Sequence, residues 1–238
     1  SMEFDAVPEF VDYDGDDDLD VSIGSLDGKI LNFENIGDNA NPVWKETDWL
    51  NIDWKTSDVP NVFIGNKNFN TVAISSLDVG ARSTPEFVDL DNDTLMDMVV
   101  GNTHGILRSF KRVIVGKSVL NPNTGQFEFV TKRTWAEFDY NLSKVTQTFR
   151  AVPRFADLDG DGDFDLIVGN QFGKLAGYEN IGNSTHTDWI QRDFNLSSIN
   201  VGANAAPDIK DLDLDMDLDL IVGSDSEISI FMNTGGLI

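Results

Sequence analysis

Short apolar stretches recur along the chain, each placed between a window rich in aspartate and a single glycine. The stretches read VSI, MVV, LIV and LIV, and they end at Gly24, Gly101, Gly169 and Gly223. Segments such as EFV or RFA precede the aspartate windows. Runs of β-branched and aromatic residues bounded by Gly, Asn and Asp are typical of short strands joined by turns, and no segment shows sustained helical periodicity. The pattern predicts an all-β protein.

This unit occurs four times in register. The aspartate windows DYDGDDDLD, DLDNDTLMD, DLDGDGDFD and DLDLDMDLD begin at Asp12, Asp89, Asp157 and Asp211. A proline stands four residues before each window, at Pro8, Pro85, Pro153 and Pro207. Because both flanks keep their spacing in all four copies, they indicate an internal repeat rather than a compositional bias.

Each repeat is predicted to hold four antiparallel strands. The first leads into the aspartate window and the second leaves it. The third follows a glycine turn, as over Lys29 to Glu34 and Lys174 to Glu179, and the fourth surrounds Trp44, Trp135 or Trp189. Four short strands in a repeat of roughly 50 residues are typical of a β-propeller blade, whereas an open sandwich would not require such similar loops. We therefore expect a β-propeller, with these tryptophans packed inside the blades.

The predicted blades span approximately 4–50, 79–140, 149–196 and 201–238, within a single propeller domain or a fragment of one. Two insertions fall near 50–76 and 111–134, and the first reads as an added hairpin around Asn66 to Asn68. The sequence leaves open whether the blades form a small four-bladed propeller, part of a larger one, or an assembly completed by another copy.

The charge of the chain is high and concentrated. The net charge is −24, which argues against nucleic acid and anionic membrane surfaces as partners. The four aspartate windows hold 20 of the 41 acidic residues. Cysteine is absent, so disulfides and thiolate metal sites are excluded, and no apolar run is long enough to span a membrane.

The alternating aspartates are candidate calcium ligands. Acids at loop positions 1, 3, 5 and 9 would surround one point, with a main-chain carbonyl at position 7. Calcium takes about six to eight oxygen ligands, magnesium keeps more of its water, and the lack of His and Cys argues against zinc-like ions. The predicted ligands, for up to four calcium ions, are Asp12, Asp14, Asp16, Asp18 and Asp20; Asp89, Asp91, Asp93, Leu95 and Asp97; Asp157, Asp159, Asp161, Asp163 and Asp165; and Asp211, Asp213, Asp215, Asp217 and Asp219. Without an ion, four carboxylates in one loop would repel by roughly 5 kcal/mol.

The loops differ at position 6, where glycine accepts a positive φ without strain. Only the third loop has glycine there, as Gly162, while the others carry Asp17, Thr94 and Met216. We expect calcium affinity to fall in the order third, first, second and fourth loop.

The windows resemble the FG-GAP and VCBS repeats, which build the head propeller of integrin α-chains and many secreted surface proteins. The motif D-x-D-G-D-G-x-x-D-L-x-x-G is met closely from Asp157 to Gly169 and loosely in the other three copies. The resemblance implies calcium bound by the side chains of Asp157, Asp159, Asp161 and Asp165 and by the Asp163 carbonyl. It also implies a cell-surface or extracellular protein that binds a protein or glycan ligand, although integrin propellers usually have more blades than four.

We expect no enzymatic activity, because no catalytic constellation is recognisable. The two histidines, His104 and His186, stand alone, and no G-x-S-x-G motif occurs. The alternative is a lectin-like propeller or an accessory domain of a secreted polysaccharide-active enzyme.

The insertions are the expected place for specificity, since loops on a rigid scaffold carry function. The first insertion gathers the aromatic residues Trp49, Trp54, Phe63 and Phe69. The second gathers the basic residues Arg108, Lys111, Arg112, Lys117, Lys132 and Arg133. These basic residues predict either a docking patch for an acidic partner or a solvated strand face.

Overall fold

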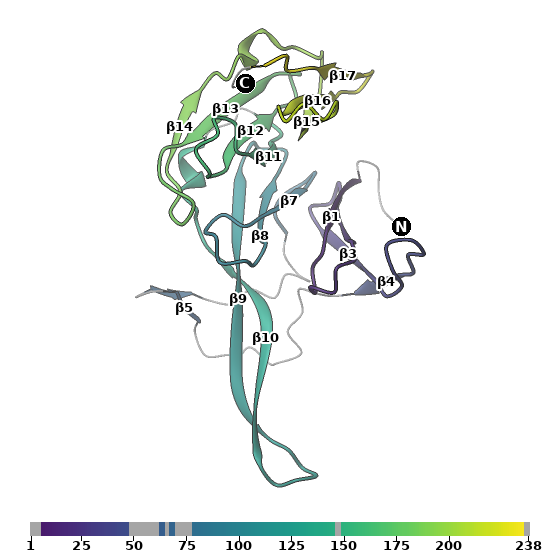
Figure 1. The fold of residues 1–238 in the computed structure, drawn as a ribbon, viewed down its shortest axis with the longest axis vertical. Coiled ribbons are helices and arrows are strands. Elements are labelled where there is room, and N and C mark those ends of the chain that lie inside the picture. The colour runs from purple at the N-terminus through teal and green to yellow at the C-terminus, as the bar shows by residue number, and fades with distance from the viewer. Residues whose placement is uncertain (1–5, 48–61, 65–66, 70–77, 146–148, 236–238) are drawn as a thin grey trace.

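The computed structural model describes residues 6–47, 62–64, 67–69, 78–145 and 149–235, and it confirms an all-β propeller of four blades (Figure 1). The first blade contains β1 (Val7–Val11), β2 (Asp20–Gly24), β3 (Ile30–Asn35) and β4 (Trp44–Thr47). The second contains β7 (Thr84–Val88), β8 (Asp97–Gly101), β9 (Leu107–Leu120) and β10 (Phe127–Glu137). The third contains β11 (Val152–Ala156), β12 (Asp165–Gly169), β13 (Leu175–Asn180) and β14 (Trp189–Arg192). The fourth contains β15 (Ala206–Lys210), β16 (Asp219–Gly223) and β17 (Ile228–Phe231). Two 3₁₀ turns, η2 (Leu142–Lys144) and η3 (Leu196–Ser198), follow the second and third blades.

Each blade is an antiparallel meander whose first strand forms one edge of the sheet. The repeated proline lies in that strand, with Pro8 opposite Ile23 and Pro153 opposite Val168. Proline has no backbone N–H to donate to a neighbouring strand. An edge strand pairs on one side only, so it tolerates the missing donor. The first strands of successive blades contact one another, β1 with β7, β7 with β11, and β11 with β15.

The core lies between successive blades, which explains the continuous apolar stretches in the sequence. In β8, Met98 and Val100 pack in the cluster shared with the first blade, whereas Val99 packs in the cluster shared with the third. In β12, Leu166 faces the second blade and Ile167 the fourth. A strand that is buried on both faces needs apolar residues at every position rather than at alternate ones.

The glycine that ends each apolar stretch marks the junction with the next blade. A Cβ added to Gly169 would lie 2.3 Å from the carbonyl oxygen of Ala205 and 2.7 Å from Cδ of Pro207. At Gly24 the nearest atom would be the Ser83 carbonyl oxygen, 2.0 Å away. The junctions therefore require a residue without a side chain. Gly223 in the fourth blade is different, because the atom nearest to an added Cβ would be 3.8 Å away, an ordinary contact distance.

The first strands of the four blades also meet in a group of charged residues that surrounds Arg154 of β11. Its guanidinium lies 3.0 Å from Glu9 of β1 and 3.5 Å from Asp208 of β15, and it contacts the carboxylate of Glu86 in β7. Each of these residues follows the repeated proline, so one structural position in every blade contributes to the group. Burial raises the pKa of Glu86 to about 8, although Arg154 opposes the shift.

The repeated tryptophans are not all buried. Trp135 and Trp189 are buried as predicted, and each lies near a phenylalanine of the first strand of its blade. Trp44 has the same kind of partner, Phe10 at a ring distance of 6.4 Å, yet it is 44% exposed. Its predicted place inside the blade was therefore wrong.

The two insertions take different forms. The second lengthens β9 and β10 into a hairpin arm that extends away from the blades (Figure 1). In the first, β5 (Val62–Ile64) pairs with β6 (Lys67–Phe69), which confirms the added hairpin. Trp49 and Trp54 lie outside the described residues. Within the described part of the chain, no helix is long and apolar enough to cross a membrane.

Candidate metal centres

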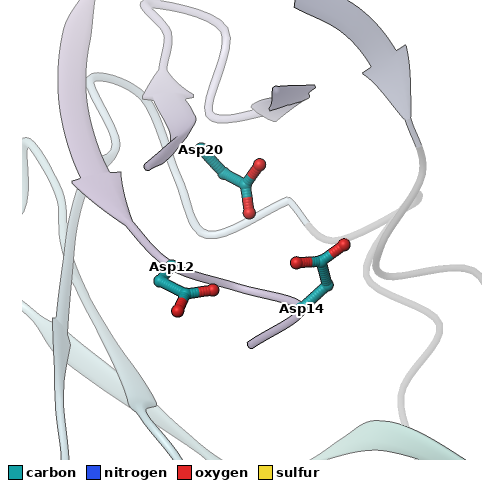
Figure 2. A group of neighbouring side chains, drawn as sticks. All are labelled: Asp12, Asp14 and Asp20. Carbon is teal, nitrogen blue, oxygen red and sulfur yellow. The ribbon is translucent and has the colours of Figure 1, made fainter. Parts of the chain in front are cut away.

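Every aspartate window forms the loop between the first and second strands of its blade, and each loop brings three carboxylates together. Figure 2 shows the first of these groups, in which Asp12, Asp14 and Asp20 converge. In every group one oxygen from each residue lies within 4.8 Å of the others. The remaining groups are Asp89, Asp91 and Asp97; Asp157, Asp159 and Asp165; and Asp211, Asp213 and Asp219. The structure thus gathers positions 1, 3 and 9 of every window.

Position 9 anchors the loop to the third strand of the blade. Asp165 accepts hydrogen bonds from the backbone N–H of Leu158 at 3.0 Å and of Asn180 at 2.9 Å. Asp20 accepts the equivalent bonds from Tyr13 and Asn35. Burial raises the pKa of Asp165 to about 7, against the opposing effect of the two backbone bonds. A buried carboxylate held this way is positioned to bind a cation.

Position 1 shapes the turn. In the third loop, Asp157 accepts hydrogen bonds from the backbone N–H groups of Gly160, Asp161 and Gly162, at 2.8 to 3.1 Å. The position 5 carboxylate is also engaged locally, since Asp161 accepts from the N–H of Asp163 at 3.1 Å. Among the described residues, the position 5 aspartates, predicted as ligands, lie outside the groups of three; they are Asp16, Asp93, Asp161 and Asp215.

Several loop carboxylates keep a buried oxygen with no hydrogen-bond partner. These oxygens are Oδ1 of Asp91 and Asp159 at position 3, and Oδ1 of Asp18 and Asp163 at position 7. A buried acceptor without a donor costs about 1–3 kcal/mol, and more when it is charged. Burial and the neighbouring acids Asp161 and Asp159 raise the pKa of Asp163 to about 6. The unsatisfied oxygens fit a hard cation such as calcium, which takes only oxygen ligands.

Position 7 differs from the prediction in one respect. It was expected to contribute only its carbonyl, but Asp18 and Asp163 also turn their side chains inward, and both are buried. Three of the four loops carry aspartate at this position, and only the second has Leu95. That difference was the sequence signal that the position 7 side chain could also be buried in the loop.

Comparison with protein families adds a direct match on the third blade. Residues 151–185 match the family described as FG-GAP repeat. The chain is an FG-GAP repeat β-propeller. A comparison with curated proteins finds no match. The matched segment contains the complete third loop, from Asp157 to Asp165, and the other FG-GAP blades share its strand order and its converging carboxylates.

The backbone of this FG-GAP propeller follows one path in all four loops. Positions 4 and 6 have positive φ throughout, 76° and 93° at Gly160 and Gly162, and 63° and 76° at Leu214 and Met216. A left-handed conformation costs roughly 1–2 kcal/mol in a residue with a side chain. The absence of glycine therefore leaves the path of the fourth loop unchanged and places strain in it.

Basic side chains reach the loops from the neighbouring strands. In the third blade, Arg192 lies 3.0 Å from Oδ2 of Asp159 and 3.1 Å from Glu179. In the second, Nζ of Lys111 lies 2.7 Å from Oδ2 of Asp93 and also contacts Asp91, and its side chain is only 8% exposed.

Arg112 and Arg133 extend from the second blade to the first loop. Arg112 is buried, donates to the carbonyl of Tyr13 and stacks 4.0 Å from its ring centre. Arg133 donates to the carbonyl of Asp14 at 2.6 Å. The expectation of an exposed basic patch or a solvated face was therefore wrong for Lys111 and Arg112, while the side chains of Lys117 and Lys132 lie outside the description.

Proposed function

We propose that this chain is a non-enzymatic, calcium-binding propeller of an extracellular or cell-surface protein, in which calcium stiffens the blade loops and the scaffold presents a surface to a protein partner. The observation that carries the calcium assignment is the convergence of three carboxylates in each loop, together with the unpartnered buried oxygens of Asp159 and Asp163.

A bound ion would act on the stability of the blade. Position 9 closes the loop on itself and holds it to the third strand, as Asp165 does through Leu158 of the loop and Asn180 of β13. A cation shared by positions 1, 3 and 9 would cancel their mutual repulsion and join both ends of the loop. Calcium sites of extracellular modules have Kd values of about 10⁻⁴–10⁻³ M, so such loops would be filled where calcium is abundant. This requirement supports an extracellular location.

The hairpin arm of β9 and β10 supports a role in protein interaction. Four of its large apolar side chains are mostly exposed, namely Ile114, Leu120, Phe127 and Phe129. Exposed apolar groups gathered on one element mark surfaces that bind other proteins. We expect the arm to contact the partner, with a protein rather than a sugar as its ligand.

Thermal melting with calcium, magnesium or chelator tests the calcium assignment. We expect calcium to raise the melting temperature by several degrees at millimolar concentration and magnesium to do so less. Asp159→Asn should weaken the calcium effect, whereas Asp225→Asn, outside the loops, should preserve it. Equal melting temperatures in calcium and chelator would refute the proposal.

Binding of the purified chain to intact cells and to extracellular matrix, each in calcium and in chelator, tests the interaction role. Replacing Phe127 and Phe129 by serine should reduce binding without changing the melting temperature. Retained binding by this variant, or binding only to isolated glycans, would contradict a protein-binding arm.

A further inference from the structure

We propose that the second loop holds no calcium ion, because the ammonium group of Lys111 takes the place of the ion, so that the chain binds at most three. This inference rests on the proposed calcium binding of the other loops. In the second blade the cation is then a side chain of the protein, the ammonium group of Lys111.

The ammonium group of Lys111 bridges two aspartates of the second loop. Its Nζ lies 2.7 Å from Oδ2 of Asp93 and contacts Oδ2 of Asp91, which belongs to the carboxylate group with Asp89 and Asp97. The side chain is 8% exposed, so the ammonium group is held inside the loop rather than in solvent. A lysine amine is charged at neutral pH, and it offers three donors to the surrounding oxygens.

The equivalent residue can be identified in every blade from the bonds of position 9. Oδ1 of this aspartate accepts the N–H of Asn35 in the first blade, Arg112 in the second, Asn180 in the third and Asn233 in the fourth. The preceding residues are therefore equivalent: Glu34, Lys111, Glu179 and Met232. The first and third blades place a carboxylate beside the loop, the fourth a neutral side chain, and the second a cation.

An ion and the ammonium group exclude each other on the same oxygens. Calcium would lie about 2.3–2.6 Å from its carboxylate oxygens, and Oδ2 of Asp91 already contacts Nζ of Lys111. The second window also has the fewest acids, with Leu95 at position 7 where the other loops carry aspartate. One further oxygen, Oδ1 of Asp91, has no hydrogen-bond partner, so removal of the lysine would leave both oxygens of Asp91 open.

Arg192 in the third blade does not play the same part. It contacts a single loop aspartate, Asp159, and forms a second ion pair with Glu179. Its side chain is 42% exposed, and Oδ1 of both Asp159 and Asp163 stays unpartnered. The third loop thus retains oxygens for an ion, whereas the second loop has an internal cation bridging two of its aspartates.

Calcium stoichiometry measured by native mass spectrometry and equilibrium dialysis at saturating calcium tests the inference. The wild-type chain should bind no more than three ions. Lys111→Met, which copies the fourth blade, and Lys111→Glu, which copies the first and third, should each bind one ion more than the wild type. The reciprocal change Glu179→Lys should remove one ion.

A matched pair keeps the test independent of the folding of the lysine variants. Asp91→Asn should leave the number of bound ions unchanged, whereas Asp159→Asn at the equivalent position of the third loop should lower it by one. Four ions in the wild type, or loss of an ion in Asp91→Asn, would overturn the inference while leaving the proposed calcium role intact. No ion at all in the wild type would instead overturn the proposed function.

Discussion

Substitution of alanine for Gly169 should destabilise the propeller at the junction of the third and fourth blades. The new Cβ would lie 2.3 Å from the carbonyl oxygen of Ala205, whereas ordinary contact begins near 3.4 Å, so the backbone of the fourth blade must retreat by about 1 Å. The backbone bond from the N–H of Ala205 to the carbonyl of Asn170, 2.9 Å long, lies beside the contact and would be strained. Overpacking costs typically about 1–3 kcal/mol, and a weakened buried hydrogen bond adds about 1 kcal/mol or more.

We therefore expect Gly169→Ala to lower the free energy of unfolding by about 3 kcal/mol. In a domain of this size each kcal/mol corresponds to roughly 2–4 °C, so the melting temperature should fall by about 6–12 °C in calorimetry. Gly223→Ala is the matched control, because its Cβ would meet nothing closer than 3.8 Å, and it should change stability by less than about 0.5 kcal/mol. Similar losses in both variants would refute the role assigned to the junction.

Three further predictions follow from buried and strained groups. In chelator the melting temperature should fall as pH rises from 5 to 8. Burial raises the pKa of Asp165 to about 7, so the folded state holds a proton that the unfolded state releases, and this stability is lost as pH passes that value; a melting temperature that rises over this range would contradict the burial of this acid. Met216→Gly should stabilise the chain by about 1 kcal/mol in urea unfolding, since the backbone of Met216 is left-handed and its side chain is exposed. A loss of stability would show that the side chain makes a favourable contact. Trp135→Ala should cost about 3–5 kcal/mol in the same assay, whereas the half-exposed Trp44→Ala should cost much less, and equal effects would disprove their different burial.

The fold was predictable because its signals are local and repeated. Proline on the first strand, aspartates in the loop, an apolar second strand and a closing glycine recur at fixed spacing, and each has a distinct physical cause in the structure. Edge strands tolerate Pro8, and the blade junction requires Gly169. The convergence of positions 1, 3 and 9 followed from the same spacing.

Contacts between blades were beyond reach of that reasoning. Arg112 follows Lys111 in the sequence, yet it crosses to the loop of the first blade while Lys111 turns into its own loop. Alternate side chains of a strand point to opposite faces, and only the positions of the neighbouring blades decide what each one meets. The sequence therefore predicted one basic surface where Lys111 and Arg112 in fact lie on opposite faces of β9. The exposure of Trp44 likewise depends on what covers the outer strand of one blade.

Arg154 has a consequence for how the propeller comes apart. In many repeat proteins each unit contacts only its neighbours, so the array can unfold in segments from one end. Here one guanidinium in the third blade contacts carboxylates from the first, second and fourth. Detaching the first or the second blade would remove a carboxylate from beside the largely buried Arg154, and breaking a buried pair costs about 3–5 kcal/mol. Asp208 of the fourth blade is half exposed, so its contact contributes less. A single side chain thus links the four blades, so the loss of one blade weakens a group of contacts that the other three share.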